Sequence, residues 1–361
     1  MKRIGILTGG GDCPGLNAVI RAVTKSALAG GLGVIGYKDG YEGLILNQWI
    51  PLNQAMVSGI LVQGGTILGT SNTANPYRWP VKSRSGRFHF KDVSKQAIAN
   101  FKKAKLCALI VVGGDGTMSI ARRLHQQGIP IIGIPKTIDN DLSGTEVTFG
   151  FETAVVTAAE AIDKIHTTAQ AHHRAMVVEV MGRYAGWIAL YAGVASGGDV
   201  ILIPEIPYEM KYVYRRICER NAMGKNFSII VVAEGAKPKG GSLTVMRRVP
   251  KSTDPVRLGG VGIKIAEDIE KHLGLESRAS VLGHVQRGGS PTPFDRLLAT
   301  QFGSHAVHMV CSGDFGKMVV YKQNDVSSVL LEEATGSLKL VPADYHLIAS
   351  ARAVGTSFGD R

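Results

Sequence analysis

A glycine-rich segment near the start of the chain has the composition of an anion-binding loop. Residues 8–17 read TGGGDCPGLN and follow a short apolar run. The glycines allow backbone N–H groups to approach an anion closely, and Pro14 suits the first turn of a helix, whose N-terminus attracts negative charge. A plain tight turn is the alternative interpretation, because a glycine cluster alone is weak support for phosphate binding.

A second glycine-rich segment, residues 113–117 (GGDGT), also follows an apolar run. Asp115 stands between glycines, so no neighbouring side chain blocks its carboxylate, and carboxylate oxygens are ligands that Mg²⁺ prefers. Capping of the following helix is the alternative role for Asp115. Kinases of lipids and of dinucleotides share a GGDG segment, so this motif indicates phosphoryl transfer without identifying the acceptor.

A third segment, residues 135–141 (PKTIDND), places two carboxylates two residues apart on one loop. Transfer of a phosphoryl group to an alcohol needs a base near the hydroxyl and cations on the transferring group. Asp139 and Asp141 could divide the tasks of accepting a proton and supporting a metal ion, and Lys136 could supply a cation. An Asx-turn built on Asp139 or Asn140 is the structural alternative.

Two later segments combine glycine with arginine. Arg183 ends residues 179–183 (EVMGR), and Arg287 lies within residues 283–290 (GHVQRGGS). Arg binds phosphate through two parallel hydrogen bonds, and a His beside glycines can add a further donor. The other basic residues close to these segments are Arg174, Arg278 and His284. Together they predict a second phosphate site apart from the glycine loops, although each motif alone would suit a surface salt bridge.

The elements that must position these residues follow from seven continuous apolar runs. The runs are residues 4–8, 106–112, 130–134, 176–180, 200–203, 229–233 and 279–282. Continuous runs suit parallel strands that are covered on both faces, and helical stretches such as 153–168 and 262–273 lie between them. The pattern predicts an α/β fold with two doubly wound, Rossmann-like domains. Ligands of such sheets bind at the carboxyl ends of strands, so we expect the active site in the cleft between the domains.

Composition narrows the choice of partners. The formal charge is +12, but Lys and Arg are scattered, so small anionic substrates explain part of this charge better than nucleic acid does. The four cysteines form no CxxC pair, which suggests reduced thiols in a cytoplasmic protein. No apolar run approaches the length of a membrane span, so no membrane partner is expected. The strand-like residues 3–8 make a signal peptide unexpected as well.

Taken together, the motifs resemble the phosphofructokinase family. The matching segments, in order and roughly in spacing, are residues 9–12, 113–116, 137–141, 181–183 and 283–291. The resemblance extends from Lys2 to about Gly316. Residues 336–360 resemble the tail of a long-chain bacterial group that includes pyrophosphate-dependent and mixed-substrate members.

The resemblance implies a glycolytic kinase that transfers the γ-phosphoryl group of ATP to the 1-hydroxyl of fructose 6-phosphate, with Mg²⁺ as cofactor. Asp139 would be the general base, assisted by Thr137, and Arg183 would stabilise charge on the transferring group. Asp115 would hold Mg²⁺. The residues implied to pack against ATP are Gly11, Gly114, Asp115, Gly116 and Thr117.

The resemblance also implies a sugar-phosphate site. Glu234 would bind sugar hydroxyls, and His284 with Arg287 would bind the 6-phosphate. The other implied contacts in the same subunit are Thr137, Ile138, Asp139, Met181, Gly182, Arg183, Val285 and Gln286. Arg174 and Arg278 would reach the phosphate from a neighbouring subunit, which implies a homo-oligomer: a tetramer, with a dimer as the alternative.

The length and motif order suggest how the chain is divided. Residues 1–150 would form the nucleotide-binding domain, completed by residues 286–336. Residues 151–285 would form the sugar-phosphate-binding domain, completed by residues 337–361. Residues 238–261 are rich in Gly, Pro and Lys and predict an exposed excursion.

Two departures from the family pattern concern ATP and regulation. Family members carry an Arg for the ATP phosphates where this chain has Asn72 and Thr73, and Arg78 is a candidate replacement. The basic effector-site pattern is also incomplete, so a response to ADP or phosphoenolpyruvate through that site is not expected. Two of its positions match and two do not: Arg21 and Lys25, against Gln54 and His166.

The phosphoryl donor is where the motifs disagree. Pyrophosphate-dependent members generally have Asp where this chain has Gly116, and Lys where it has Lys136. A carboxylate at position 116 would repel the α-phosphate of ATP, so Gly116 favours ATP. A pyrophosphate-dependent enzyme is therefore the main alternative. An inactive sugar-phosphate-binding regulator is a weaker alternative, because Asp115, Asp139 and Asp141 are all present. A lipid or dinucleotide kinase is also weaker, because residues 137–141 and 284–287 are present as well and the second segment suits a small sugar phosphate.

Overall fold

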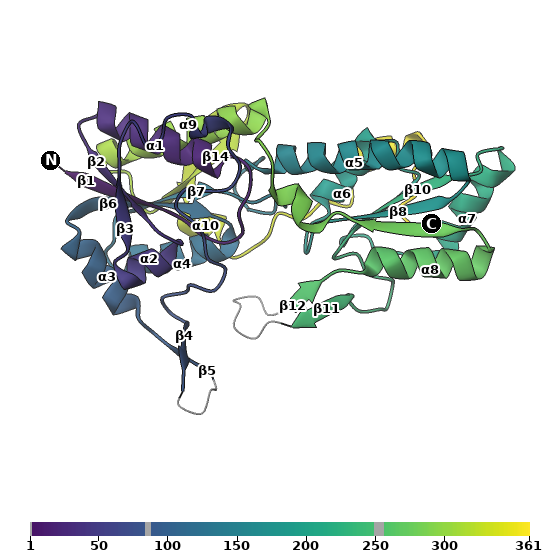
Figure 1. The fold of residues 1–361 in the computed structure, drawn as a ribbon, viewed down its shortest axis with the longest axis horizontal. Helices are drawn as coiled ribbons and strands as arrows, with labels where there is room; N and C mark the ends of the chain where they lie inside the picture. Colours follow the sequence, from purple (N-terminus) through teal and green to yellow (C-terminus); the bar gives the residue numbers. More distant parts are fainter. Residues whose placement is uncertain (1, 84–87, 249–255) are drawn as a thin grey trace.

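The computed structural model describes residues 2–83, 88–248 and 256–361. The chain forms two α/β domains that lie side by side along the long axis of the molecule (Figure 1). The first contains a seven-stranded sheet and the second a four-stranded sheet. The fold class expected from the apolar runs is confirmed.

The first sheet has five parallel strands in its centre and an antiparallel strand at each edge. In spatial order the strands are β15 (Asp325–Leu330), β14 (Lys317–Lys322), β7 (Ile131–Pro135), β6 (Leu106–Gly113), β1 (Arg3–Thr8), β2 (Gly33–Tyr37) and β3 (Trp49–Leu52). The apolar runs did not predict the edge strands. β15 (DVSSVL) has no fully buried residue and mixes polar with apolar side chains, so it offers no continuous apolar run.

Helices cover both faces of this sheet (Figure 1). One layer consists of α1 (Leu16–Ala29) and α9 (Pro293–Ser312). The opposite layer consists of α2 (Tyr41–Leu46), α3 (Ser94–Lys103), α4 (Asp115–Gln126) and α10 (Leu331–Ala334). Alternate residues of β6 therefore enter different cores: Ile110 packs with the α1 and α9 layer, and Val111 packs with the α4 layer. Burial on both sides is the reason for the unbroken apolar run.

The second sheet is entirely parallel. Its order is β13 (Ser277–Val281), β8 (Ala175–Val180), β10 (Ser228–Ala233) and β9 (Val200–Leu202). Its upper layer in Figure 1 contains α5 (Phe151–His172), α6 (Trp187–Ala195) and α11 (His346–Ala353), and its lower layer contains α7 (Met210–Ala222) and α8 (Val261–Leu273). Side chains from the upper layers of both domains form one continuous hydrophobic core.

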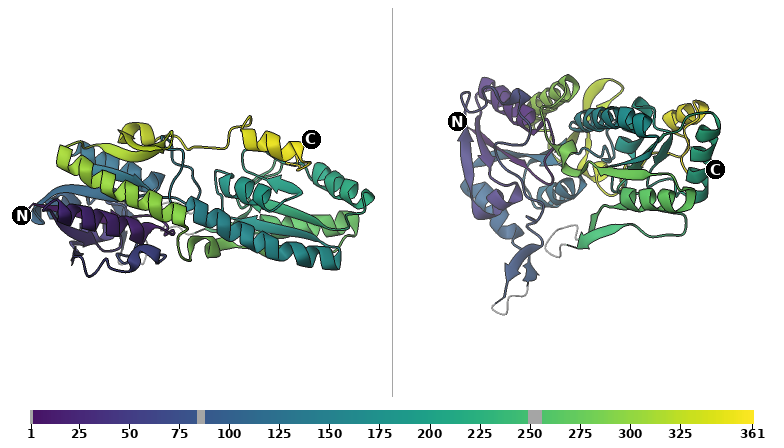
Figure 2. Two further views of the ribbon diagram at one scale, coloured as in Figure 1. Left: turned by 90° about the horizontal axis from the view of Figure 1, so that it is seen from above. Right: turned by 45° about the vertical axis from the view of Figure 1, so that its right-hand side comes forward.

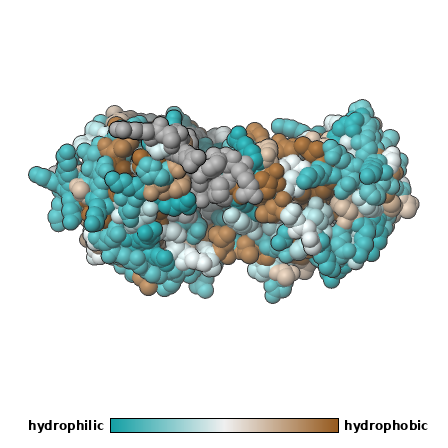
Figure 3. Space-filling model, turned by 90° about the horizontal axis from the view of Figure 1, so that it is seen from below, coloured by the Kyte–Doolittle hydropathy of each residue, from teal (hydrophilic) through white to brown (hydrophobic). Residues whose placement is uncertain are grey.

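Two antiparallel hairpins extend from the lower side of the molecule (Figure 1). One pairs β4 (Trp79–Lys82) with β5 (Phe88–Lys91), and the other pairs β11 (Val245–Arg248) with β12 (Val256–Leu258). The second hairpin belongs to the predicted excursion, of which residues 249–255 lie outside the described residues. Seen from below, this face is mostly hydrophilic at its ends and carries hydrophobic groups nearer the middle (Figure 3).

The chain crosses between the domains at residues 136–150, 282–292 and 335–345. At the first two crossings, α9 and α5 lie nearly end to end (Figure 2). Asp295 of α9 is fully buried, and its Oδ2 accepts hydrogen bonds from the backbone N (2.8 Å) and Oγ1 (2.5 Å) of Thr153 in α5. Thr292 caps α9 by accepting from the backbone N of Asp295. One carboxylate therefore joins the starts of two helices from different domains.

We expect Asp295→Ala to lower the free energy of unfolding by about 2–3 kcal/mol, because hydrogen bonds to a charged group contribute about 1.5–3 kcal/mol and Thr153 would lose its acceptor. Burial raises the pKa of Asp295 to about 6, so the measurement belongs at pH 8, where the carboxylate is ionised. Denaturant unfolding followed by tryptophan fluorescence would measure the change. Asp163→Ala, at an exposed position of α5, is the control; equal stability of the two variants would contradict the role of Asp295.

Candidate active site

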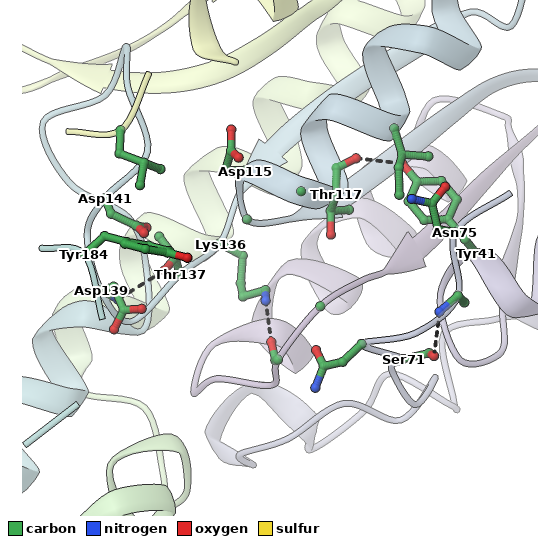
Figure 4. Close-up of a pocket in the computed structure, with 18 of the residues that line it drawn as sticks. Tyr41, Ser71, Asn75, Asp115, Thr117, Lys136, Thr137, Asp139, Asp141 and Tyr184 are labelled. Atoms are coloured by element: carbon green, nitrogen blue, oxygen red, sulfur yellow. Dashed lines mark hydrogen bonds between the residues drawn. The ribbon is translucent and has the colours of Figure 1, made fainter. Parts of the chain in front are cut away.

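A pocket of about 440 Å³ opens at the carboxyl ends of β1, β6 and β7, where the domains meet. All three glycine- and aspartate-rich segments border it. The motif residues that line it are Gly10, Gly11, Gly114, Asp115, Gly116, Thr117, Lys136, Thr137, Asp139, Asp141 and Arg287. In Figure 4, Asp139, Asp141 and Tyr184 lie on one side and Thr117, Tyr41 and Asn75 on the other, with Lys136 between them. The segments are thus parts of one site.

The first glycine loop follows β1 and leads into α1. Asn17 of α1 donates to the backbone oxygens of Gln63 and Gly64 and accepts from Ile67 N at 2.8 Å, which fixes a neighbouring loop. A Cβ at Gly11 would lie 2.8 Å from Nη1 of Arg287, so a side chain there would displace the guanidinium. The backbone of this loop therefore comes close to a guanidinium.

The second loop leads from β6 into α4. Asp115 is the first residue of α4, so the helix N-terminus and its unpaired N–H groups face the pocket. The hydroxyl of Tyr41 donates to the backbone oxygen of Thr117 at 2.8 Å and holds the first turn in place. Burial, and secondarily the charge of Asp141, raises the pKa of Asp115. A cation or a substrate phosphate with its cation would relieve that repulsion.

Asp139 has the environment of a proton acceptor. Its backbone N donates to Oγ1 of Thr137 at 3.1 Å, while its side-chain Oδ1 is buried and has no hydrogen-bond partner among the described residues. Burial and then the neighbouring Asp141 raise its pKa to about 7, against the opposing effect of Arg287, Lys136 and Arg183. A carboxylate tuned close to neutral pH can both accept and return a proton efficiently.

Lys136 connects the third loop to the first. Its ammonium donates to the backbone oxygen of Gly11, and the side chain is 4% exposed. Burial lowers its pKa, and Cys13, Asp12 and Asp139 nearby oppose that shift. The cation is therefore placed where phosphate oxygens bound by the first loop would lie.

On the side of the second domain, Arg287 donates from Nη1 to the backbone oxygen of Asp12 at 3.1 Å. It therefore borders the same pocket as the glycine loops, whereas its motif had suggested a phosphate site apart from them. Burial, followed by the charge of Asp139, raises the pKa of Glu234 to about 7. Arg183 donates to the backbone oxygen of Val256 at 2.9 Å. These groups surround Asp139 with charges of both signs.

Several predicted residues lie away from the pocket. The side chain of Ile138 is fully buried in the core, so only its backbone can face a ligand. Gln286 is also fully buried and donates to Gly283 O at 3.3 Å. His284 and Val285 are exposed beside it, while Met181 packs against the core and Gly182 is buried behind Arg183. Their predicted substrate contacts stay predictions.

Arg174 and Arg278 lie at the start of the second sheet, beside the first residues of β8 and β13. Both donate to Glu276 at 2.7 Å, and the Arg278 side chain is half exposed. Neither belongs to the described residues that line the pocket. Their predicted contact with the substrate of a neighbouring subunit stays a prediction.

The structure adds lining residues that the motifs did not reveal. They are Tyr41, Ser71, Ala74, Asn75, Ile120, Tyr184 and Leu338. Asn72 lines the pocket too, at the position where an Arg was expected. Arg78 stacks on the ring of Phe90 at 4.4 Å and is not among the described lining residues, so its side chain does not replace that Arg in this conformation. A tyrosine or serine without a glycine-rich context carries no recognisable signal in one sequence.

The described residues contain no group of three or more His, Cys, Asp or Glu side chains arranged to hold a metal ion. Mg²⁺ does not require such a group, because one or two carboxylates with substrate phosphates suffice, and Asp115 fits that arrangement. Among the described residues, no helix has the length and apolar character needed to cross a membrane.

Comparison with known proteins agrees with this geometry. The Phosphofructokinase family model matches residues 3–310. The chain is 52% identical over 362 residues to ATP-dependent 6-phosphofructokinase 2 of Clostridium perfringens, covering 100% of this chain and 99% of the relative. It is 49% identical to the pyrophosphate–fructose 6-phosphate 1-phosphotransferase of Amycolatopsis methanolica, covering 95% and 97%.

Solved structures show the same fold. The T-state phosphofructokinase of Pichia pastoris aligns with a TM-score of 0.78 and 34% identity, over 92% of this chain and 37% of the yeast chain. The pyrophosphate-dependent phosphofructokinase of Nitrosospira multiformis aligns with a TM-score of 0.81 at 21% identity, over 99% and 92%. The motifs, the fold and the full-length matches lead to one conclusion: the chain belongs to the phosphofructokinase family.

Proposed function

We propose that this protein is an ATP-dependent 6-phosphofructokinase, which converts fructose 6-phosphate and ATP to fructose 1,6-bisphosphate and ADP. The observation that carries the proposal is the single pocket that joins Asp139 to the N-terminus of α4 and the first glycine loop. Asp139 removes the proton of the sugar 1-hydroxyl, the oxygen attacks the γ-phosphorus, and the bond to the ADP oxygen breaks. The full-length relatives named ATP-dependent 6-phosphofructokinase support this assignment.

Mg²⁺ fits the nucleotide side of the pocket. We assign Asp115 as its protein ligand, because its carboxylate lies at the start of α4 and its raised pKa reflects unrelieved burial and repulsion. When bound, Mg²⁺ neutralises charge on the phosphates of the donor. Gly11, Gly114, Gly116 and Thr117 pack against ATP, and Lys136 binds phosphate oxygens beside the first loop.

The sugar phosphate binds on the side of the second domain. Glu234 binds sugar hydroxyls, Arg183 stabilises the transferring group, and His284 with Arg287 binds the 6-phosphate. Arg174 and Arg278 complete this site in a neighbouring subunit, in a homo-oligomer that we propose to be a tetramer. Glu276 already holds both guanidinium groups together at the surface, which suits a shared phosphate contact. The free cysteines suit a cytoplasmic enzyme.

Pyrophosphate is the second candidate donor. Lys136 and the Amycolatopsis methanolica relative favour it. Gly116 favours ATP, because a Cβ at that position would meet no described atom within 4 Å and the space is open to a nucleotide. A coupled assay that supplies ATP or pyrophosphate at equal concentration with fructose 6-phosphate tests the proposal. We expect turnover with ATP and little or none with pyrophosphate, and the reverse preference would overturn the assignment.

Replacing the proposed base should remove most of the chemistry. We expect Asp139→Asn to lower kcat on the order of 10²–10⁴-fold while the affinity for fructose 6-phosphate changes little, because the amide keeps the shape and loses the basic oxygen. Steady-state kinetics and equilibrium binding separate the two quantities. Asp344→Asn, at an exposed position, is the control. A near-normal kcat at saturating substrate would show that Asp139 is not the base.

The donor preference should respond to charge at position 116. We expect Gly116→Asp to reduce ATP-dependent activity at least 10-fold and to shift the ratio toward pyrophosphate. Two unit charges about 4 Å apart repel by about 4 kcal/mol at an effective dielectric constant near 20, and pyrophosphate lacks the nucleoside end. Gly116→Ala adds a methyl group without charge and should keep most ATP activity, since the space is open. Full ATP activity in Gly116→Asp would contradict this role of Gly116.

A further inference from the structure

The last crossing of the chain passes directly beside residues 136–141, which we call the base loop because they contain Asp139. We call residues 335–341 the strap; it forms the start of the yellow segment that runs from the first domain to the second in Figure 2. Leu338 of the strap lines the active-site pocket and pairs with Leu142 in an antiparallel bridge. Ser143 donates from Oγ to Ser337 O at 2.7 Å. The strap therefore follows the segment that leaves Asp141.

Lys339 is the residue through which the strap holds this segment. Its Nζ donates to Oδ1 of Asn140 at 2.9 Å, to the backbone oxygen of Thr145 at 3.0 Å and to that of Glu146 at 2.8 Å. An ammonium group has three protons, so all three are used. Its backbone N also donates to Asp141 O at 2.8 Å. Lys339 thus binds the base loop through both its side chain and its backbone.

The backbone conformation of Asn140 determines where the two carboxylates of that loop point. Asn140 lies between Asp139 and Asp141 and has a positive φ of 51°, a left-handed conformation that Asn adopts more readily than most other residues. Its Oδ1 accepts from Lys339 and also from Thr148 N at 3.1 Å. Rotation at Asn140 would redirect both flanking carboxylates, so the contact with Lys339 fixes where Asp139 points.

The other edge of the strap is tied to the second domain. Nε1 of Trp187 donates to the backbone oxygen of Lys339 at 2.9 Å. Val341 N donates to Oε1 of Glu205 at 2.9 Å, and the same carboxylate accepts from Gly186 N at 3.0 Å. Gly186 and Trp187 end the loop that carries Arg183. The strap therefore lies between the loop of the base and the loop of the arginine.

We propose that Lys339 is a positioning residue that keeps the Asp139 loop of one domain aligned with the Arg183 loop of the other. This inference rests on the proposed function. Lys339 itself is not among the described residues that line the pocket, so it acts through the residues that it holds, Asn140 and Asp141. Misplacement of a catalytic group by about 1 Å can cost on the order of 100-fold in rate without weakening substrate binding.

The test is Lys339→Met, which keeps the length of the side chain and removes its three donors. We expect kcat to fall 10-fold or more, on the order of the loss that a misplaced base causes, with both KM values within about threefold of wild type. Lys322→Met, at an exposed position of β14, is the matched control and should behave as wild type. An unchanged kcat in Lys339→Met, with an active wild-type enzyme, would overturn the proposal. An inactive wild type would instead overturn the proposed function.

A chemical rescue separates positioning from a merely structural role. Lys339→Cys treated with 2-bromoethylamine acquires an ammonium at nearly the lysine length, and we expect its kcat to recover. Wild type and Lys339→Met treated in the same way account for reaction at the exposed Cys218 and Cys311. If Lys339→Met does not fold, Trp187→Phe removes the bond to the strap backbone while keeping an aromatic ring against Tyr345, although part of the indole packing is lost with it. This variant should lower kcat with little change in KM. No recovery in the first experiment, or a normal kcat in Trp187→Phe, would contradict the proposal.

Discussion

Burial, and after it the charge of a neighbouring carboxyl group, raises the pKa of Asp139 and of Glu234, because Asp139 lies close to both Asp141 and Glu234. Such a cluster is stable only where cations and backbone donors surround it. Lys136 and Arg287 supply the cations, and each also donates a hydrogen bond to a backbone oxygen of the first glycine loop. The charges that make Asp139 basic therefore also hold the loop on which the donor would bind.

This balance requires elements from both domains. The base loop and the glycine loops end strands of the first sheet, whereas Glu234 and Arg183 follow strands of the second. The continuous core beneath α5 and α9 and the buried carboxylate of Asp295 join the domains on one side. The strap joins them on the other side through Lys339. The site thus lies between two fixed connections, which limits how far its two halves can separate.

On the proposed assignment, the two candidate donors would use the same loops, and position 116 would distinguish them by the space beside it. The open space at Gly116 lies at the start of α4, next to the carboxylate that would hold Mg²⁺. Lys136 attracts phosphate oxygens near Gly11, which suits pyrophosphate without excluding ATP. A carboxylate at position 116 would exclude ATP by its bulk and charge, whereas the cation of Lys136 attracts both ligands. Position 116 would therefore be the more selective of the two positions.

The sequence by itself determined the fold class, because strands buried on both faces require continuous apolar runs. It also indicated which loops line the pocket, because glycine- and aspartate-rich segments after a strand are a local signal. It did not reveal the antiparallel edge strands, the lining residues Tyr41 and Tyr184, or the clamp of Lys339 on Asn140. Lys339 lies 199 residues beyond Asn140 along the chain, and nothing in its neighbourhood distinguishes it from a surface lysine. Only the tertiary structure decided that its ammonium meets three acceptors of residues 140–146, since that contact depends on the path of the strap between two domains.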